Sequence, residues 1–146
     1  MANKENEAVF RRMVEEAFGG GRPELIDELV AEDCIEHQFG FDPPDREGNK
    51  RGTAFLHRLA PDFEIRVEDK VSEGDKVWGR MRARGTHTGP GLGEPTGRTF
   101  DITVMDVVRI RNGKIVEHWG VPDRFAQLSQ LGLLPRANGA EAGRHA

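Results

Sequence analysis

Tyrosine is absent from this chain of 146 residues, and Cys34 is its single cysteine. Without tyrosine there is no phenolic hydroxyl to donate a hydrogen bond to an oxyanion, so a histidine, a protonated carboxyl group or water has to take that role. A lone cysteine excludes an intrachain disulfide and a cysteine metal cage. We expect Cys34 to be a small buried residue rather than a nucleophile.

Long apolar runs and clusters of positive charge are also missing. No stretch approaches the roughly 18 apolar residues that span a bilayer, and the polar residues 1–7 contain no apolar signal core. A net charge of −4 and a pI near 5.8 give no electrostatic reason to expect binding to nucleic acid or to an anionic membrane. We therefore expect a soluble, cytoplasmic protein with neither of these partners.

The first half of the chain has the apolar spacing of helices. A first helix is predicted over residues 5–18 and ends at three consecutive glycines, residues 19–21. A second begins at Pro23, which suits the first position of a helix, and its predicted buried face includes Leu29 and Val30. After a loop over residues 37–49, a third helix over residues 53–59 ends before Pro61.

The second half changes to the two-residue period of strands. A first strand is predicted from residue 63 to Val71, followed by strands over residues 77–86 and 100–110. Asn112-Gly113 predicts a tight type I′ turn into a fourth strand, and residues 124–132 predict a short closing helix. The pattern predicts an α+β fold over residues 1–135, with N-terminal helices packed on a four-stranded antiparallel sheet. Residues 136–146 are predicted to be a disordered tail.

The last predicted strand carries ionisable side chains where a merely structural strand would be apolar. A two-residue turn would pair Val108 with Glu117 and Asp106 with Trp119, which places Asp106 and Glu117 on the inner apolar face, about 7 Å apart at Cβ. His118 would then face outward. A carboxylate on an apolar wall loses hydration, which suits it to proton transfer. The structural alternative, in which these acids pair with arginines or reach water, stays open.

Two further histidines are candidates for a site. His87, at the end of the second strand, is either a hydrogen-bond donor in a cavity or a satisfied polar residue at its rim. His37 lies in a loop that would cover the mouth of a pocket. The sequence has no HExxH motif and no paired-cysteine spacing, so no metal site is expected.

Short motifs then occur in a fairly specific order between residues 6 and 134. They are Arg11-Arg12, Ala60-Pro61-Asp62-Phe63, Glu73-Gly74-Asp75-Lys76-Val77, Gly85-Thr86-His87-Thr88-Gly89, Pro95-Thr96-Gly97-Arg98, the run from Arg109 to Trp119, Asp123, and Gln130-Leu131-Gly132. In these motifs the chain resembles the SnoaL-like polyketide cyclases, also called ester cyclases, of the NTF2-like superfamily. The resemblance implies a cone formed by a curved sheet with an internal cavity, assembled as a homodimer or higher homo-oligomer.

The resemblance also implies a reaction, the closure of a polyketide ring by intramolecular aldol condensation without metal or organic cofactor. An aspartate removes a proton next to a carbonyl group, and the enolate is delocalised through the substrate. Asp123 matches a motif acid of the family, and Asp106 matches the acidic residue before Arg-Ile-Arg. Glu117 is a third candidate for the base. His87 would donate to the enolate oxygen or relay a proton.

A hydrophobic carbonyl compound is the expected substrate of this cyclisation or of a related isomerisation, and its identity stays open. By the resemblance, His37 would contact it from the lid, and Phe63, Met81 and Trp119 would line its pocket. Two alternatives remain, because one fold hosts many functions. The inner carboxylates would activate water in an epoxide or ester hydrolase, or the domain would bind a small molecule without turning it over.

Overall fold

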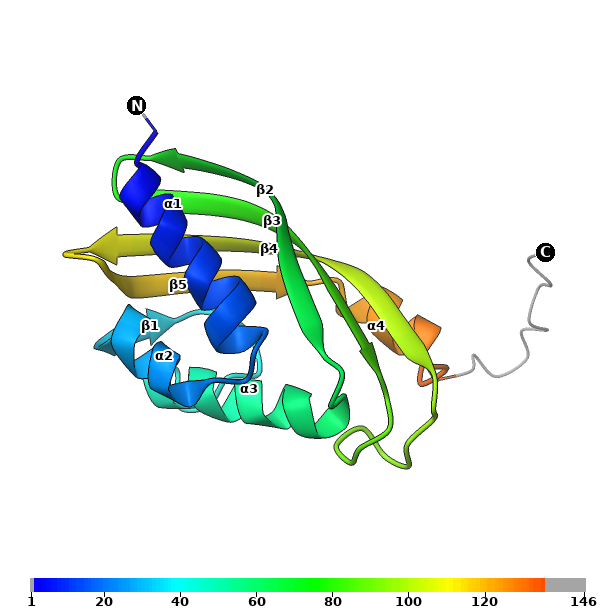
Figure 1. Cartoon of the computed structure of the whole chain (residues 1–146). Coiled ribbons are helices and arrows are strands. Elements are labelled where there is room, and N and C mark those ends of the chain that lie inside the picture. The colour runs from blue at the N-terminus through cyan, green and yellow to red at the C-terminus, as the bar shows by residue number, and fades with distance from the viewer. Residues whose placement is uncertain (1, 136–146) are drawn as a thin grey trace.

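The computed structural model describes residues 2–135, which form an α+β fold built on one curved, unclosed sheet (Figure 1). The helices are α1 (Lys4–Arg11), its π-helical continuation η1 (Arg12–Phe18), α2 (Pro23–Leu29), α3 (Arg46–Leu59) and α4 (Arg124–Gln130). The strands are β1 (Val30–Glu36), β2 (Glu64–Glu73), β3 (Lys76–Thr86), β4 (Thr99–Arg111) and β5 (Lys114–Pro122). The predicted tail, residues 136–146, lies outside the described residues.

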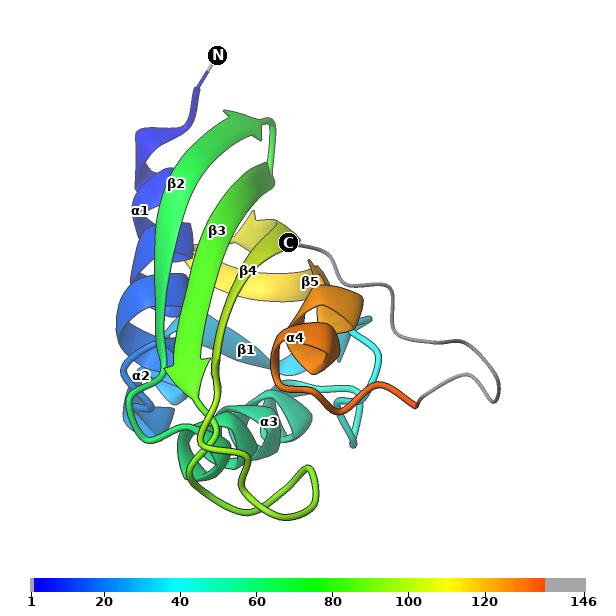
Figure 2. The ribbon, with the colours of Figure 1, turned by 90° about the vertical axis from the view of Figure 1, so that its right-hand side faces the viewer.

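The sheet bends over the N-terminal helices, so that α1, α2 and α3 lie on its concave side (Figures 1 and 2). Strands β2 to β5 form the predicted antiparallel meander, and α4 packs beside β4, where the Gln130 side chain accepts a hydrogen bond from the Asp101 backbone (2.7 Å). In residues 2–135 no helix is both long enough and apolar enough to cross a membrane. The N-terminal helices therefore cover the concave side, and α4 packs against the sheet beside β4.

The described part of the sheet has five strands, so the prediction of four is wrong. The order is β1-β5-β4-β3-β2, and β1 adds to the edge of the meander by pairing in parallel with β5. The predicted second helix ends at Leu29, and Val30 is already in strand β1. Only Val30, Cys34 and Glu36 of this strand are buried, and its pairing shifts register between Val30 and Ile35. This irregular pattern lacks the two-residue period of an ordinary strand.

A β-bulge in β2 reverses the direction of the side chains that follow it. Glu68 is the extra residue, so Val71, predicted to face inward, is 62% exposed while Ser72 is buried. Ser72 uses that position to hold the first helix. Its hydroxyl donates to the Glu7 carboxylate (2.7 Å) and accepts from the backbone N–H of Asn3 (2.7 Å).

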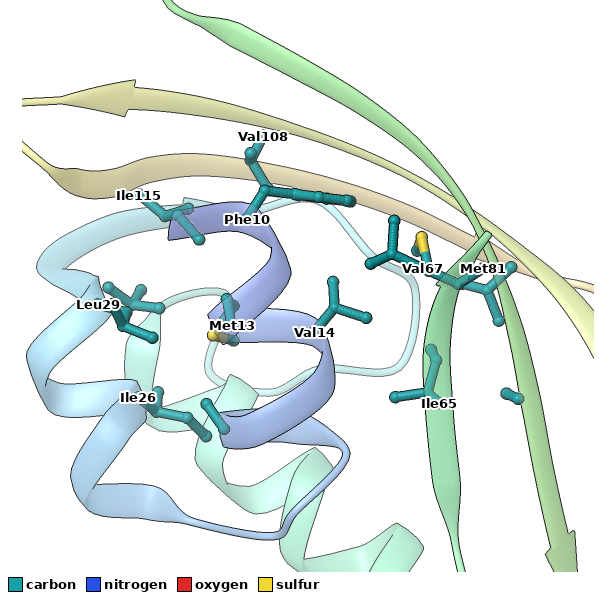
Figure 3. Packing of buried hydrophobic residues seen from close by; sticks show 14 of the residues in the cluster. Phe10, Met13, Val14, Ile26, Leu29, Ile65, Val67, Met81, Val108 and Ile115 are labelled. Carbon is teal, nitrogen blue, oxygen red and sulfur yellow. The ribbon is translucent and has the colours of Figure 1, made fainter. Parts of the chain in front are cut away.

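The hydrophobic core lies between the first helix and the sheet (Figure 3). Phe10 and Val14 point from the helix toward Val67 and Met81 on β2 and β3. Met81 is fully buried in this packing. Gly79 faces the same helix, and a Cβ at this position would overlap the ring of Phe10. The absence of a side chain at Gly79 therefore lets the helix approach the sheet closely.

We predict that Gly79→Ala destabilises the fold, because the added methyl group forces the Phe10 ring out of its position. The expected loss is about 1–3 kcal/mol in the free energy of unfolding, measured by urea denaturation. Arg80→Ala, next along β3 with a half-exposed side chain, is the control and should change stability by less than about 1 kcal/mol. Equal stability of Gly79→Ala and the parent chain would contradict the packing argument.

Candidate active site

A second β-bulge decides which side chains of β5 point into the concave side of the sheet. Val116 is the extra residue, so Val108 pairs with His118 rather than with Glu117. The predicted directions after this point are therefore wrong. His118 faces inward, and Glu117 and Trp119 face away from the cavity.

His118 lies between two carboxylates. Its Nδ1 is 2.7 and 2.9 Å from the two oxygens of Glu36, and its Nε2 is 3.1 Å from Asp106 Oδ2. All three side chains are at least 87% buried. The prediction that Asp106 faces inward is confirmed, whereas Glu36 was not among the predicted site residues.

The two carboxylates keep His118 charged. Burial by itself lowers the pKa of the imidazole, but the charges and hydrogen bonds of Asp106 and Glu36 outweigh it and raise the pKa to about 10. At neutral pH the ring is therefore an imidazolium that donates one N–H to each carboxylate.

Further hydrogen bonds fix the carboxylate of Glu36 in this arrangement. Glu36 Oε1 accepts from the backbone N–H of Gln38 (2.8 Å), and Oε2 accepts from the Asn49 amide (3.3 Å). In contrast, Asp106 Oδ1 is buried and has no hydrogen-bond partner among residues 2–135. Gly120 pairs with Asp106 across the strands, and a Cβ there would lie 2.9 Å from this oxygen. A Cβ at Gly120 would also overlap the side-chain oxygen of Gln38, so the glycine lets the Gln38 side chain lie close to this part of the site.

Asp106 and His118 line an inner cavity of about 70 Å³ between the helices and the sheet. Most of its wall is apolar, and Phe63 lines it as predicted. Its polar lining residues are Glu36, Gln38, Asp45, Asn49, Asp106, His118, Arg124 and Gln127. Cys34 also faces it, but burial and neighbouring acids raise the pKa of the thiol to about 12. The thiol is therefore neutral, which does not suit a nucleophile.

Glu117 belongs to a separate network on the convex side of β5. Its carboxylate is 2.8 Å from His37 Nε2 and accepts from Arg109 Nε (3.1 Å). The hydrogen bond with His37 is the main cause of the lowered pKa of Glu117, supported by Arg109. The His37 ring stacks on Trp119 with centroids 4.7 Å apart. None of Glu117, His37 and Trp119 lines the inner cavity. The predicted inward placement of Glu117 and Trp119 is therefore wrong, and His37, expected as a lid contact, is instead held by Glu117 and Trp119.

Three other predicted residues also lie outside the cavity lining. His87 is fully buried, and its Nδ1 accepts from the backbone N–H of Thr96 (3.3 Å). Asp123 is exposed and caps α4 by accepting from the N–H of Ala126 (3.0 Å). Met81 packs in the core against the first helix. The structure therefore gathers Asp106 and Phe63 of the predicted residues, and adds Glu36 and His118 as partners of Asp106.

The missed residues carried only weak signals in the sequence. Cys34, Glu36 and Gln38 have the two-residue spacing of one strand face, and Arg124 and Gln127 have the three-residue spacing of one helix face. Both segments are too short for such spacings to stand out. Within the described residues, no group of three or more His, Cys, Asp or Glu side chains is arranged to hold a metal ion.

A curved sheet over N-terminal helices, with a cavity between them, is the NTF2-like architecture that was expected. In this chain Glu36, Asp106 and His118 line the cavity. Residues 8–131 match the sequence profile of the family described as SnoaL-like polyketide cyclase. The chain belongs to this family.

Named relatives agree with this assignment. The aklanonic acid methyl ester cyclases DauD of Streptomyces sp. strain C5 and DnrD of Streptomyces peucetius are each 30% identical over 129 residues, which is 85% of this chain and 80% and 88% of theirs. Among solved structures, IdmH of Streptomyces antibioticus, described as a candidate polyketide cyclase, is 38% identical. It superimposes with a TM-score of 0.78 over 87% of this chain and 98% of its own.

We predict that His118 makes stability depend on pH in the alkaline range. Because the folded-state pKa of about 10 exceeds the ordinary 6.5, the contribution is complete below pH 6.5 and is lost as the pH rises to 10. The loss should be on the order of a few kcal/mol in the free energy of unfolding. In His118→Gln, the free energy of unfolding should not show this part of the decrease between pH 6.5 and 10. An imidazole that titrates near 6.5 by ¹⁵N NMR would contradict the prediction.

Proposed function

We propose that this chain is a polyketide cyclase that closes a ring by cofactor-independent intramolecular aldol addition, with Asp106 as the base. The observation that carries the proposal is the pair of unequal oxygens on Asp106. Oδ2 is bound by His118, while Oδ1 is buried in an apolar cavity without a partner among the described residues. Family membership supports the reaction class.

In the proposed reaction, Asp106 Oδ1 takes a proton from the carbon next to a substrate carbonyl group. The resulting enolate carbon attacks a second carbonyl carbon of the same molecule, and the electron pair of that C=O bond moves to its oxygen. Asp106 then returns the proton to the new alkoxide, so the addition gains and loses no protons or electrons overall. The apolar wall excludes water, which would otherwise compete for the same proton.

His118 and Glu36 position the base in this proposal. The imidazolium holds Asp106 Oδ2, which leaves the other oxygen turned toward the cavity. Glu36 accepts from Nδ1 on the far side of the ring, which fixes its orientation. His87, Glu117 and Asp123 have no part in the proposed step, because each makes its contacts elsewhere.

We predict that Asp106→Asn lowers kcat by at least about 100-fold, because the amide cannot accept the proton. Aklanonic acid methyl ester, the compound in the names of the two relatives, is the first substrate to assay by chromatography of the cyclised product. Glu117→Gln and Asp123→Asn are matched controls that should retain nearly full activity.

Each of the following outcomes would contradict part of the proposed function. Full activity in Asp106→Asn, or its loss in Asp123→Asn with Asp106→Asn unaffected, would move the base away from Asp106. A product that has gained one oxygen from H₂¹⁸O through a broken ester or epoxide bond would favour hydrolysis. Saturable binding without turnover, on this and related polyketides, would favour a binding protein.

Self-association is part of the proposal as well. Trp78, Met105 and Val121 are exposed on the convex face of β3, β4 and β5, where a second copy would bury them. Light scattering coupled to gel filtration should give at least twice the monomer mass of 16.3 kDa. A monomer at micromolar concentration would contradict this expectation.

A further inference from the structure

The inner cavity lies next to a larger groove on the outside of the molecule. This outer groove, of about 550 Å³, shares Gln38, Phe41, Leu56 and Arg124 with the inner cavity. An inner volume of about 70 Å³ is well below the 300–1,000 Å³ of typical ligand sites. If the reacting carbons lie beside Asp106, as the proposed function requires, the rest of a polyketide has to extend past these shared residues into the groove.

Arg124 lies at this junction, and within residues 2–135 its side chain donates to Gln127 alone. Its guanidinium donates to the side-chain oxygen of Gln127 (2.9 Å), which is itself 1% exposed. No carboxylate in residues 2–135 lies within ion-pair distance of Arg124, whereas Arg82 and Arg109 are held by Asp101 and Asp75. Arg124 is exposed as a whole, but desolvation of part of its side chain lowers the pKa, and no neighbouring charge among the described residues opposes this shift.

The stability of α4 does not explain this arginine. Arg124 is the first residue of the helix, where the positive end of the helix dipole disfavours a cation. Asp123, the residue before it, uses one carboxylate oxygen to cap the helix and forms no ion pair with Arg124. Within the fold, this guanidinium satisfies the buried side-chain oxygen of Gln127 through one N–H group, and its other N–H groups can serve a ligand.

The inner cavity and the outer groove differ in charge. The inner cavity is lined by the carboxylates of Glu36, Asp45 and Asp106 against His118 and the shared Arg124, which leaves an excess of negative charge. The outer groove contains Arg51 and Arg124 against Asp42. An anionic group would be repelled from the inner cavity and attracted at the junction, so a charged ligand can enter in one orientation only.

The outer groove also offers flat apolar surface. Phe39, Phe41 and Phe55 line it, and Phe39 is 97% exposed at its rim. The ring of Phe41 packs against Gly52 of α3, where a Cβ would overlap the ring. Aromatic side chains of this kind stack on the fused rings of an aromatic ligand.

We propose that Arg124 binds the carboxylate of an aromatic polyketide acid at the junction of the inner cavity and the outer groove. The rings of the substrate lie in the outer groove, and its reactive carbonyl chain enters the inner cavity beside Asp106. A methyl ester, the form named for the two curated relatives, lacks the charge that this site recognises. The free acid is therefore the preferred substrate class of this chain.

A matched pair of ligands tests the proposal without any need for turnover. The dissociation constants of 2-naphthoate and methyl 2-naphthoate are measured by isothermal titration calorimetry on the full chain. We expect the parent protein to bind the acid roughly tenfold more tightly than the ester, as a charge-assisted hydrogen bond provides. Arg124→Gln should bind the two ligands equally, whereas Arg124→Lys should keep part of the preference.

The controls separate this proposal from the proposed reaction. Arg66→Gln removes the same charge from an exposed site on β2 and should leave the preference unchanged. Asp106→Asn should keep the preference while it loses turnover. The proposal is overturned if the parent shows no preference, if Arg124→Gln retains it, or if Arg51→Gln alone abolishes it. Any of these results would leave the role of Asp106 unaffected.

Discussion

The extra residue at Val116 controls the chemistry of the whole concave side. Before the bulge, β5 follows the register set by the hairpin; after it, every side chain has changed face. The change brings His118 against Asp106 and opposite Glu36 of β1, and it sends Glu117 and Trp119 to the convex side. Without the bulge, Glu117 would face the cavity near Asp106, and His118 would not lie between the carboxylates of Asp106 and Glu36. A local irregularity in one strand thus determines the charge balance of a buried site.

The parts of the fold that the sequence predicts correctly are those with uninterrupted periodicity. Strand β4 pairs with β3 without a shift from Thr99 to Arg109, so alternation correctly directs Asp106 inward. Strands β2 and β5 each contain a bulge, and the bulged residues, Glu68 and Val116, are of no special type. Counting alternate residues therefore fails beyond each of them, as the misplacement of Val71 and His118 shows.

Long-range contacts account for the rest of what the sequence did not reveal. Strand β1 is short and irregular, and it becomes a strand by pairing with residues that lie about eighty positions further along the chain. Glu36 joins the site by the same contact, and Arg124 by its position on α4. Local spacing contains little information about such pairings. The resemblance to a known family therefore predicts the cone and its cavity better than it predicts which acids and bases occupy that cavity.

The pairing of Glu36 with His118 also has a consequence for synthesis of the protein. The two residues are 82 positions apart, so Glu36 is made long before the strand that neutralises it. A chain that ends before β5 has no partner for β1 and would have to bury the Glu36 carboxylate without a cation, which is strongly unfavourable. Docking of β1 therefore has to wait until β5 has formed. On the ribosome, β1 can therefore join the sheet only after the strand that carries His118 has been made.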